Sequence, residues 1–247
     1  MEAEPDNWDV VAQQVRRAVA SLDARDFRSA SDEFADAFRK ADREQHEWTA
    51  LAFAGRLAAL VGMGHYETAA KRWAEAPEFV ISECRQKGVG IALRLPDEDL
   101  VKFMRLTSIV VHEHAWAVMN LGADLGAAGR IVASRGVLKL LVSHLHRTGD
   151  RENRHRAEAQ LGHTEALAGN SSAALDLWAT AFAAGSTNRK LALWYTRALF
   201  DGKEYARCAE VCLEALGRID RQPARRSLES RYARAVARAA VGRPAAT

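Results

Sequence analysis

A pattern of four small or apolar residues, separated by steps of three, four and three, recurs along this chain. Such steps bring all four side chains onto one face of an α-helix. The five copies are Phe27, Ala30, Phe34 and Ala37; Tyr66, Ala69, Trp73 and Ala76; Ile131, Ser134, Leu138 and Leu141; Ser171, Ala174, Trp178 and Ala181; and Tyr205, Cys208, Cys212 and Ala215. The small members let a neighbouring helix approach, and the large member fills the space beside it. The pattern predicts five helices that pack against other helices. Abundant alanine and only four tyrosines disfavour a β-sandwich or barrel.

A second helical segment precedes each copy of the pattern. Nine residues before the copies begin, these segments place Ala18, Leu57, Gly122, Gly162 and Thr196. Turn-forming pairs separate the two segments at Gly64 and His65, Gly129 and Arg130, Gly169 and Asn170, and Asp201 and Gly202. Two helices joined by so short a turn run antiparallel, so the sequence predicts five antiparallel helix pairs.

A Leu-Gly pair in the first helix and Ala-x-x-x-Trp in the second, as in Leu161, Gly162, Ala174 and Trp178, resemble the tetratricopeptide repeat. The resemblance covers about residues 8 to 216. The chain departs from the family where a first-helix Trp is usual, with Gln14, Phe53, Val118, Glu158 and Ala192 at the matching positions. The resemblance implies an all-α fold, a right-handed α-solenoid of about five antiparallel helix pairs plus a C-terminal capping helix. It also implies one repeat domain over residues 1–247.

Two segments lie outside the five pairs. Ala69 and Ser134 are 65 residues apart, whereas the other equivalent positions are 34 to 40 apart. The surplus falls at about residues 77–99, where alternating apolar residues in 87–96 favour a short extended stretch within an irregular insert. Asp97 is predicted to be the N-cap of a long helix that continues toward Gly126. A helix at about residues 227–241 is expected to cap the last apolar face, as solenoids require.

The charge of the chain is nearly balanced, with 35 Lys and Arg against 32 Asp and Glu, which disfavours a dedicated nucleic-acid binder. From residue 216 onward, eight arginines face only two acids. This basic end could contact nucleic acid, an acidic protein or the acidic N-terminus of another copy, but a solvated helix face is favoured. The predominance of arginine over lysine suggests a GC-rich bacterial gene.

The chain is expected to be cytoplasmic. Three cysteines are too few for a disulfide framework, and Cys208 and Cys212 are interpreted as core residues on one helix face. The acidic N-terminus does not resemble a secretory signal, and no apolar run is long enough to span a membrane.

No segment carries the spacing of a recognised catalytic or metal-binding motif. His112 and His114 are two residues apart around Glu113, whereas a zinc-protease helix needs histidines four apart. His144 and His146 diverge in the same way on a helix. The sequence therefore predicts no catalytic residue, metal or cofactor, although carboxylates distant in sequence could still meet in a groove and an enzyme remains open.

In a tetratricopeptide-like superhelix, the first helix of each pair lines a concave groove. The residues that this resemblance places there are Trp116, Met119, Arg156, His163, Lys190, Leu193, Arg197 and Tyr232. Their cations and apolar groups suit a peptide that is acidic or ends in a free carboxylate. The alternative is that these cations only solubilise the surface.

The function that these features favour is a non-enzymatic scaffold or adaptor that binds a protein or peptide in its groove. One alternative is a regulatory or sensor module of a bacterial signalling or transcription system. Another is a helical enzyme subunit with a pocket near residues 77–116. Self-association into a homo-oligomer stays open.

Overall fold

The computed structural model describes residues 7–41, 46–107, 115–220 and 222–241. These residues form helices joined by short turns, and no strand occurs among them, which confirms the predicted all-α class. The chain divides into two compact units, residues 1–114 (unit 1) and residues 115–247 (unit 2). The prediction of a single repeat domain over residues 1–247 stays a prediction.

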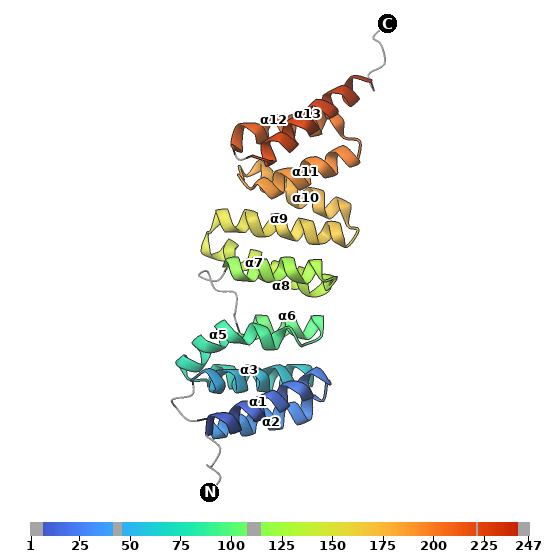
Figure 1. The fold of residues 1–247 in the computed structure, drawn as a ribbon. Coiled ribbons are helices and arrows are strands. Elements are labelled where there is room, and N and C mark those ends of the chain that lie inside the picture. Colours follow the sequence, from blue (N-terminus) through green and yellow to red (C-terminus); the bar gives the residue numbers. More distant parts are fainter. Residues whose placement is uncertain (1–6, 42–45, 108–114, 221, 242–247) are drawn as a thin grey trace. The chain divides into compact units, whose positions relative to one another are not determined.

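Unit 1 contains the first two predicted helix pairs and two further helices (Figure 1). Its helices are α1 (Asn7–Asp23), α2 (Phe27–Lys40), α3 (His46–Gly62), α4 (Tyr66–Ala74), α5 (Glu78–Ala92) and α6 (Asp97–Thr107). Helix α2 packs on α1 and α3, and α5 covers another side of α3. Phe34 of α2 is fully buried against Gly55 of α3, where a Cβ would collide with the ring. A glycine therefore sets the closeness of this helix contact.

The predicted irregular insert at residues 77–99 is wrong for most of its length. Helix α5 occupies residues 78–92, so the extended stretch expected within 87–96 does not form there. Val80, Cys84 and Ile91 are buried, at steps of four and seven that match one helix face. The thiol of Cys84 donates a hydrogen bond to the carbonyl of Ala50 on α3, with Sγ 3.2 Å from the oxygen. Burial against α3 therefore favours a helix here, although the local alternation of apolar residues had suggested an extended stretch.

A helix does begin here, but Asp97 is its first residue and not the predicted N-cap, and α6 extends to Thr107. The rest of the long helix predicted toward Gly126 crosses residues 108–114, which lie outside the described residues together with His112, Glu113 and His114. The structure resumes with α7 at Ala115.

Unit 2 contains the other three predicted pairs and the capping helix. Its helices are α7 (Ala115–Ala127), α8 (Ile131–Thr148), α9 (Arg151–Leu167), α10 (Ser171–Ala183), α11 (Arg189–Asp201), α12 (Tyr205–Arg218) and α13 (Ala224–Val241). Each helix packs on the next, and α7, α9, α11 and α13 also contact one another in that order. A helix at the position of the predicted cap is confirmed, although it starts three residues earlier, and Leu228 and Ala235 bury it against the core.

The repeat pattern correctly predicted the contacts inside the unit 2 pairs. Trp178 of α10 lies against Gly162 of α9, and its indole Nε1 donates to the carbonyl of Ala159 at 3.0 Å. Leu138 of α8 packs in the same way against Gly122 of α7. In both pairs the large stripe residue occupies the space where the partner helix has no Cβ.

The turns within pairs use left-handed backbone. Gly129 and Gly169 have φ of +78° and +80°, a region that glycine enters without steric cost. In the last pair the positive φ of +62° falls on Lys203, while Gly202, expected to supply the turn, has φ of −75°.

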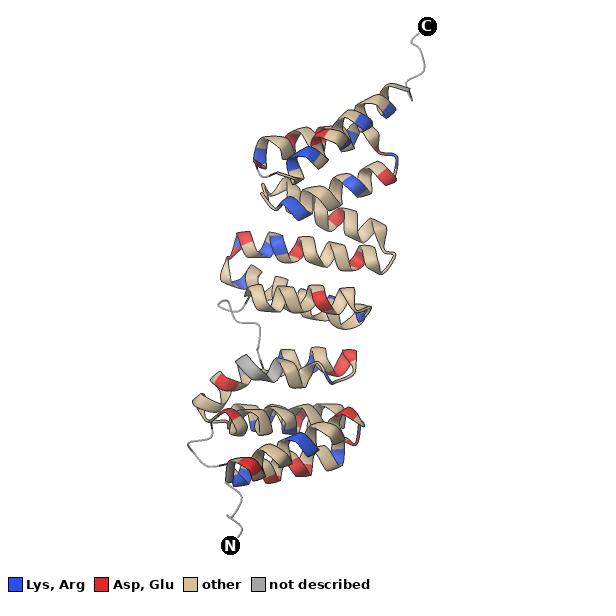
Figure 2. Ribbon diagram, viewed as in Figure 1, with Lys and Arg blue, Asp and Glu red and all other residues tan. Residues whose placement is uncertain are grey.

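Charge differs between the units. Residues 1–114 contain 15 Lys and Arg against 20 Asp and Glu, whereas residues 115–247 contain 20 against 12. Figure 2 shows that α13 carries basic residues along its length and few acidic ones. Unit 2 is therefore the part of the chain whose overall charge favours an acidic partner.

No helix within the described residues is both long and apolar enough to cross a lipid bilayer.

Candidate functional site

A cavity of about 880 Å³ lies in unit 2, and we call it the basic cavity. Its walls are formed by Trp116, Met119, Asn120, Ala123, Arg151, Glu152, His155, Arg156, Gln160, Ala184, Gly185, Ser186, Thr187, Asn188, Arg189, Lys190, Trp194, Arg218, Ile219 and Asp220. Four residues predicted for a groove are among them, namely Trp116, Met119, Arg156 and Lys190. They come from α7, α9 and α11, the first helices of the three pairs.

The basic cavity lies at the N-terminal parts of these three helices. The lining residues of α9 begin at Arg151 and those of α11 at Arg189, the first residue of each helix. Asp150 caps α9 by accepting from the amide of Asn153 at 3.1 Å, and Asn188 caps α11 by accepting from the amide of Lys190 at 2.9 Å. Helix N-termini carry partial positive charge, which the neutral amide of Asn188 leaves in place at the start of α11 and the carboxylate of Asp150 offsets at the start of α9.

Basic side chains outnumber acidic ones in the cavity wall. Arg151, Arg189 and Lys190 have no ion-pair partner among the described residues. Arg156 pairs with Glu152, one turn before it on α9. An anionic ligand would therefore meet at least three cations that form no ion pair within the described chain.

Arg218 reaches the cavity from the end of α12. Its Nη1 donates to the carbonyl of Phe182 at 2.8 Å, and its guanidinium lies 4.5 Å from the centre of the Phe182 ring. It also pairs with Glu214. These contacts fix Arg218 as part of the wall.

Two tryptophans supply apolar surface beside the cations. Trp116 is 62% exposed, which is unusual for so large an apolar side chain. Trp194 is half-buried and stacks on His163 with ring centres 4.3 Å apart and planes 1° apart. Burial, with a smaller contribution from Lys190, lowers the pKa of His163, so its ring is neutral at pH 7 and stacks without bringing a charge under Trp194.

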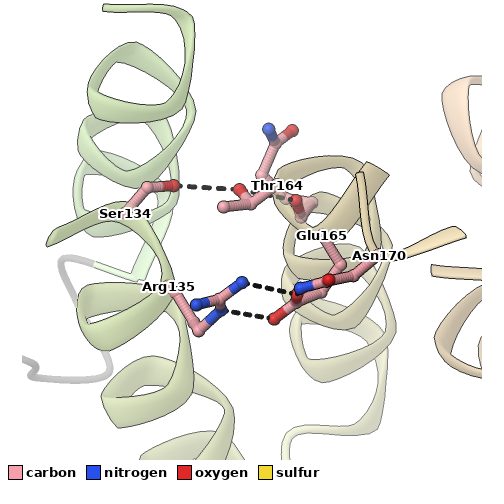
Figure 3. Close-up of polar contacts among 6 residues, drawn as sticks. Ser134, Arg135, Thr164, Glu165 and Asn170 are labelled. Atoms are coloured by element: carbon pink, nitrogen blue, oxygen red, sulfur yellow. Dashed lines mark hydrogen bonds and ion pairs between the residues drawn. The ribbon is translucent and has the colours of Figure 1, made fainter. Parts of the chain in front are cut away.

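A polar network joins α9 to α8 (Figure 3). Nε and Nη2 of Arg135 donate to the two carboxylate oxygens of Glu165 at 2.6 and 2.7 Å, and Nδ2 of Asn170 donates to the same carboxylate at 2.7 Å. Ser134 and Thr164 share a hydrogen bond of 2.9 Å deeper in the same interface. The network fixes the position and rotation of α9 and hence of the cavity residues at its other end.

The other four predicted groove residues do not line the basic cavity. His163 lies beneath Trp194, and Arg197 pairs with Asp201 at 3.5 Å. Leu193 and Tyr232 pack against the apolar core of unit 2. The prediction placed Leu193 and Arg197 on the same helix face as Lys190. In the structure the residue of α11 that lines the cavity together with Lys190 is Trp194, about one helical turn further along.

The sequence interpretation missed the segment between α10 and α11 (residues 184–188) and the cations Arg151, Arg189 and Arg218. A local sequence signal existed for Arg151 and Arg189. Asp150 and Asn188 are N-cap residues, and a basic residue follows each of them directly at the start of a helix.

His146, Cys208 and Cys212 lie on helices of unit 2. His146 on α8 lies with its Nδ1 3.1 Å from Nη1 of Arg154. Cys208 and Cys212 are buried and free, and Sγ of Cys208 donates to the carbonyl of Thr196 at 3.2 Å. Searching the described residues finds no group of three or more His, Cys, Asp or Glu that could hold a metal ion.

Comparisons with known proteins assign no family. No protein-family model matches the chain, and no curated protein sequence does. Among solved structures, the chain is similar to one described as the "TPR2AB-domain:pHSP90-complex of yeast Sti1". The two share 14% sequence identity over 92% of this chain and 99% of that chain, with a TM-score of 0.42. Similarity at this level assigns neither family nor ligand, so tetratricopeptide membership stays a prediction.

Proposed function

We propose that this protein is a non-enzymatic interaction module and that unit 2 binds an acidic peptide segment of a partner protein in the basic cavity. The observation that carries the proposal is the convergence of Arg151, Arg189 and Lys190, without carboxylate partners in the described chain, on one cavity beside the exposed Trp116. Guanidinium and ammonium groups bind carboxylates by charge-assisted hydrogen bonds. Trp116 adds apolar contact area of the kind found at interface hot spots.

The ligand chemistry follows from the cavity wall. The cations and the N-terminus of α11 favour Asp and Glu side chains or a C-terminal carboxylate, and Trp116 with Met119 favours an apolar residue next to them. We therefore expect a short sequence in which acidic residues flank an apolar or aromatic one.

The two alternative functions have fewer observations behind them. Of the described residues within 77–116, where the alternative places an enzyme pocket, only Trp116 lines the basic cavity, and none lines the hollow on α13. A regulatory or sensor module could also use a peptide-binding cavity. It would differ from an adaptor only in the function of the bound partner. A cytoplasmic location stays a prediction.

The test is fluorescence anisotropy with labelled peptides rich in Asp and Glu, and with composition-matched peptides rich in Lys and Arg. We expect the double variant Arg156→Glu, Lys190→Glu to weaken binding of the acidic peptides by about 100-fold or more, because charge reversal at two sites removes attraction and adds repulsion. Arg197→Glu is the matched control, because Arg197 pairs with Asp201 outside the cavity and its reversal should change affinity by less than about threefold.

Two results would contradict the proposal. One is equal affinity of wild type and the double variant, with helicity by circular dichroism unchanged. The other is equal weakening by Arg197→Glu, which would mean that the net charge of unit 2, and not the cavity, attracts the peptide. A comparison of free and amidated C-termini separates capture of a terminal carboxylate from capture of acidic side chains.

A further inference from the structure

A second, smaller hollow of about 360 Å³ lies on α13 and shares no residue with the basic cavity. It is lined by Arg226, Ser227, Ser230, Arg231 and Arg234. Arg226, Ser230 and Arg234 follow one another at steps of four, and Ser227 and Arg231 form the adjacent row. Steps of four lie along one helix face, so three guanidinium groups and two hydroxyls surround one small space.

Arg231 is the anchored member of this group. It is half-buried, and its Nη1 donates to the carbonyl of Leu193 at 3.1 Å and to Oγ1 of Thr196 at 2.6 Å. No carboxylate of the described chain forms an ion pair with it. Loss of water around this guanidinium lowers the pKa of Arg231, so burial disfavours its charge and a bound anion would compensate.

The other two arginines are also without an acidic partner in the described chain. The guanidinium of Arg234 lies 4.7 Å from the centre of the Phe200 ring, which orients it without neutralising it. Arg226 is exposed. Glu229 is the one acidic residue within α13, and it pairs with Arg225 at 3.1 Å. The hollow thus concentrates positive charge that the helix itself does not balance.

We propose that this hollow binds a terminal phosphate group of a soluble ligand. A carboxylate has two oxygens and can satisfy one guanidinium in a bidentate pair, whereas a terminal phosphate has three oxygens and close to two negative charges. Three guanidiniums match that charge and number of acceptors, and Ser227 and Ser230 can donate two further hydrogen bonds. Nucleic acid is less well matched, because the residues that line the hollow include no aromatic ring on which a base could stack.

The test is isothermal titration calorimetry of the full chain with inorganic pyrophosphate at constant ionic strength, with chloride as the reference anion. We expect saturable binding to wild type. The double variant Arg226→Gln, Arg234→Gln should bind at least about tenfold more weakly, since two of three cations are lost. Arg238→Gln is the matched control, an exposed arginine on the same helix outside the hollow, and should leave the affinity unchanged within about twofold.

The proposal is overturned by any of three outcomes: no saturable pyrophosphate binding, equal binding by the double variant, or equal weakening by Arg238→Gln. Thermal melting checks that the variants fold, and their exposed positions predict melting close to wild type. A short single-stranded RNA that competes with pyrophosphate and binds more tightly would assign the helix to nucleic acid and would also contradict the proposal. Binding of acidic peptides to the basic cavity should be the same in wild type and the double variant, so the two proposals can fail separately.

Discussion

Gly162 shows how one residue sets the distance between two helices of unit 2. A Cβ built on Gly162 would lie 2.5 Å from Nε1 and 2.8 Å from Cδ1 of Trp178. Trp178 is only 3% exposed and its indole donates to Ala159, so the ring has little freedom to move aside. The absence of one methyl group therefore allows α9 and α10 to pack at this distance.

Gly162→Ala should accordingly lower the free energy of unfolding by about 1–3 kcal/mol, through overpacking against Trp178. Gly217→Ala is the control, because a Cβ at position 217 of α12 meets no neighbouring atom within 4 Å. That change should be neutral or stabilise by up to about 1 kcal/mol, as expected from helix propensity. Urea unfolding of the three proteins measures the difference, and equal stability of both variants would contradict the close contact.

Glu165 gives unit 2 a pH dependence that can be isolated. Hydrogen bonds from Arg135 hold the pKa of Glu165 below its ordinary value of 4.5, since they favour the charged carboxylate. A lowered pKa in the folded state means that the stabilisation is complete above pH 4.5 and is lost as the pH falls through the lowered pKa.

Glu165→Gln should cost about 1–3 kcal/mol at pH 7, because the change leaves a partly buried guanidinium without its charged partner. The stability difference between wild type and variant should shrink as the pH falls below 4.5. Urea unfolding over this pH range checks both statements. A difference that stays constant with pH would show that the carboxylate charge at position 165 contributes nothing.

At the scale of helices, the same stripe position has different environments in the two units. Trp178 on α10 is buried between α9 and α11, whereas Trp73 on the nine-residue helix α4 is half-buried, with its ring centre 6.5 Å from that of Phe53. The sequence pattern predicts equivalent environments for the two tryptophans, because it shows their spacing from neighbouring stripe residues but not how long each helix is.

Trp178→Ala should cost about 3–5 kcal/mol through the cavity it leaves, and Trp73→Ala should cost clearly less, because solvent already reaches part of its side chain. Urea unfolding of both variants ranks them. The reverse order would mean that the core of unit 2 is not organised around Trp178.

Two independent signals support helix pairs of unit 2 that form as predicted. Periodicity and turn residues coincide around Gly129 and Gly169, and the pairs that they separate form as expected. Helix α5 was not predicted, because it contains Gly88 and Gly90, which disfavour helix, among apolar residues that alternate as in a strand. Its burial against α3 is a tertiary effect, so local sequence could not show it.

At the scale of the molecule, the charge is divided between an acidic unit 1 and a basic unit 2. Four of the eight residues predicted for a groove line the basic cavity, and these four lie on the N-terminal parts of first helices, while their role in binding stays a prediction. Sequence reasoning could not find the residues of the 184–188 segment, because the path of a connecting segment depends on the helices that it joins. It also placed Leu193 where Trp194 lies, since a difference of one position changes a helix face by about 100°.

The most direct test of peptide capture by unit 2 uses the indole NH signals of the six tryptophans in a two-dimensional NMR spectrum, each assigned with a Trp→Phe variant. Trp116 and Trp194 line the basic cavity, whereas Trp48 and Trp73 belong to unit 1. On titration with an acidic peptide, we expect saturable shifts of the Trp116 and Trp194 signals, unchanged Trp48 and Trp73 signals, and no shifts in the Arg156→Glu, Lys190→Glu variant. Binding that leaves the Trp116 and Trp194 signals in place would contradict it.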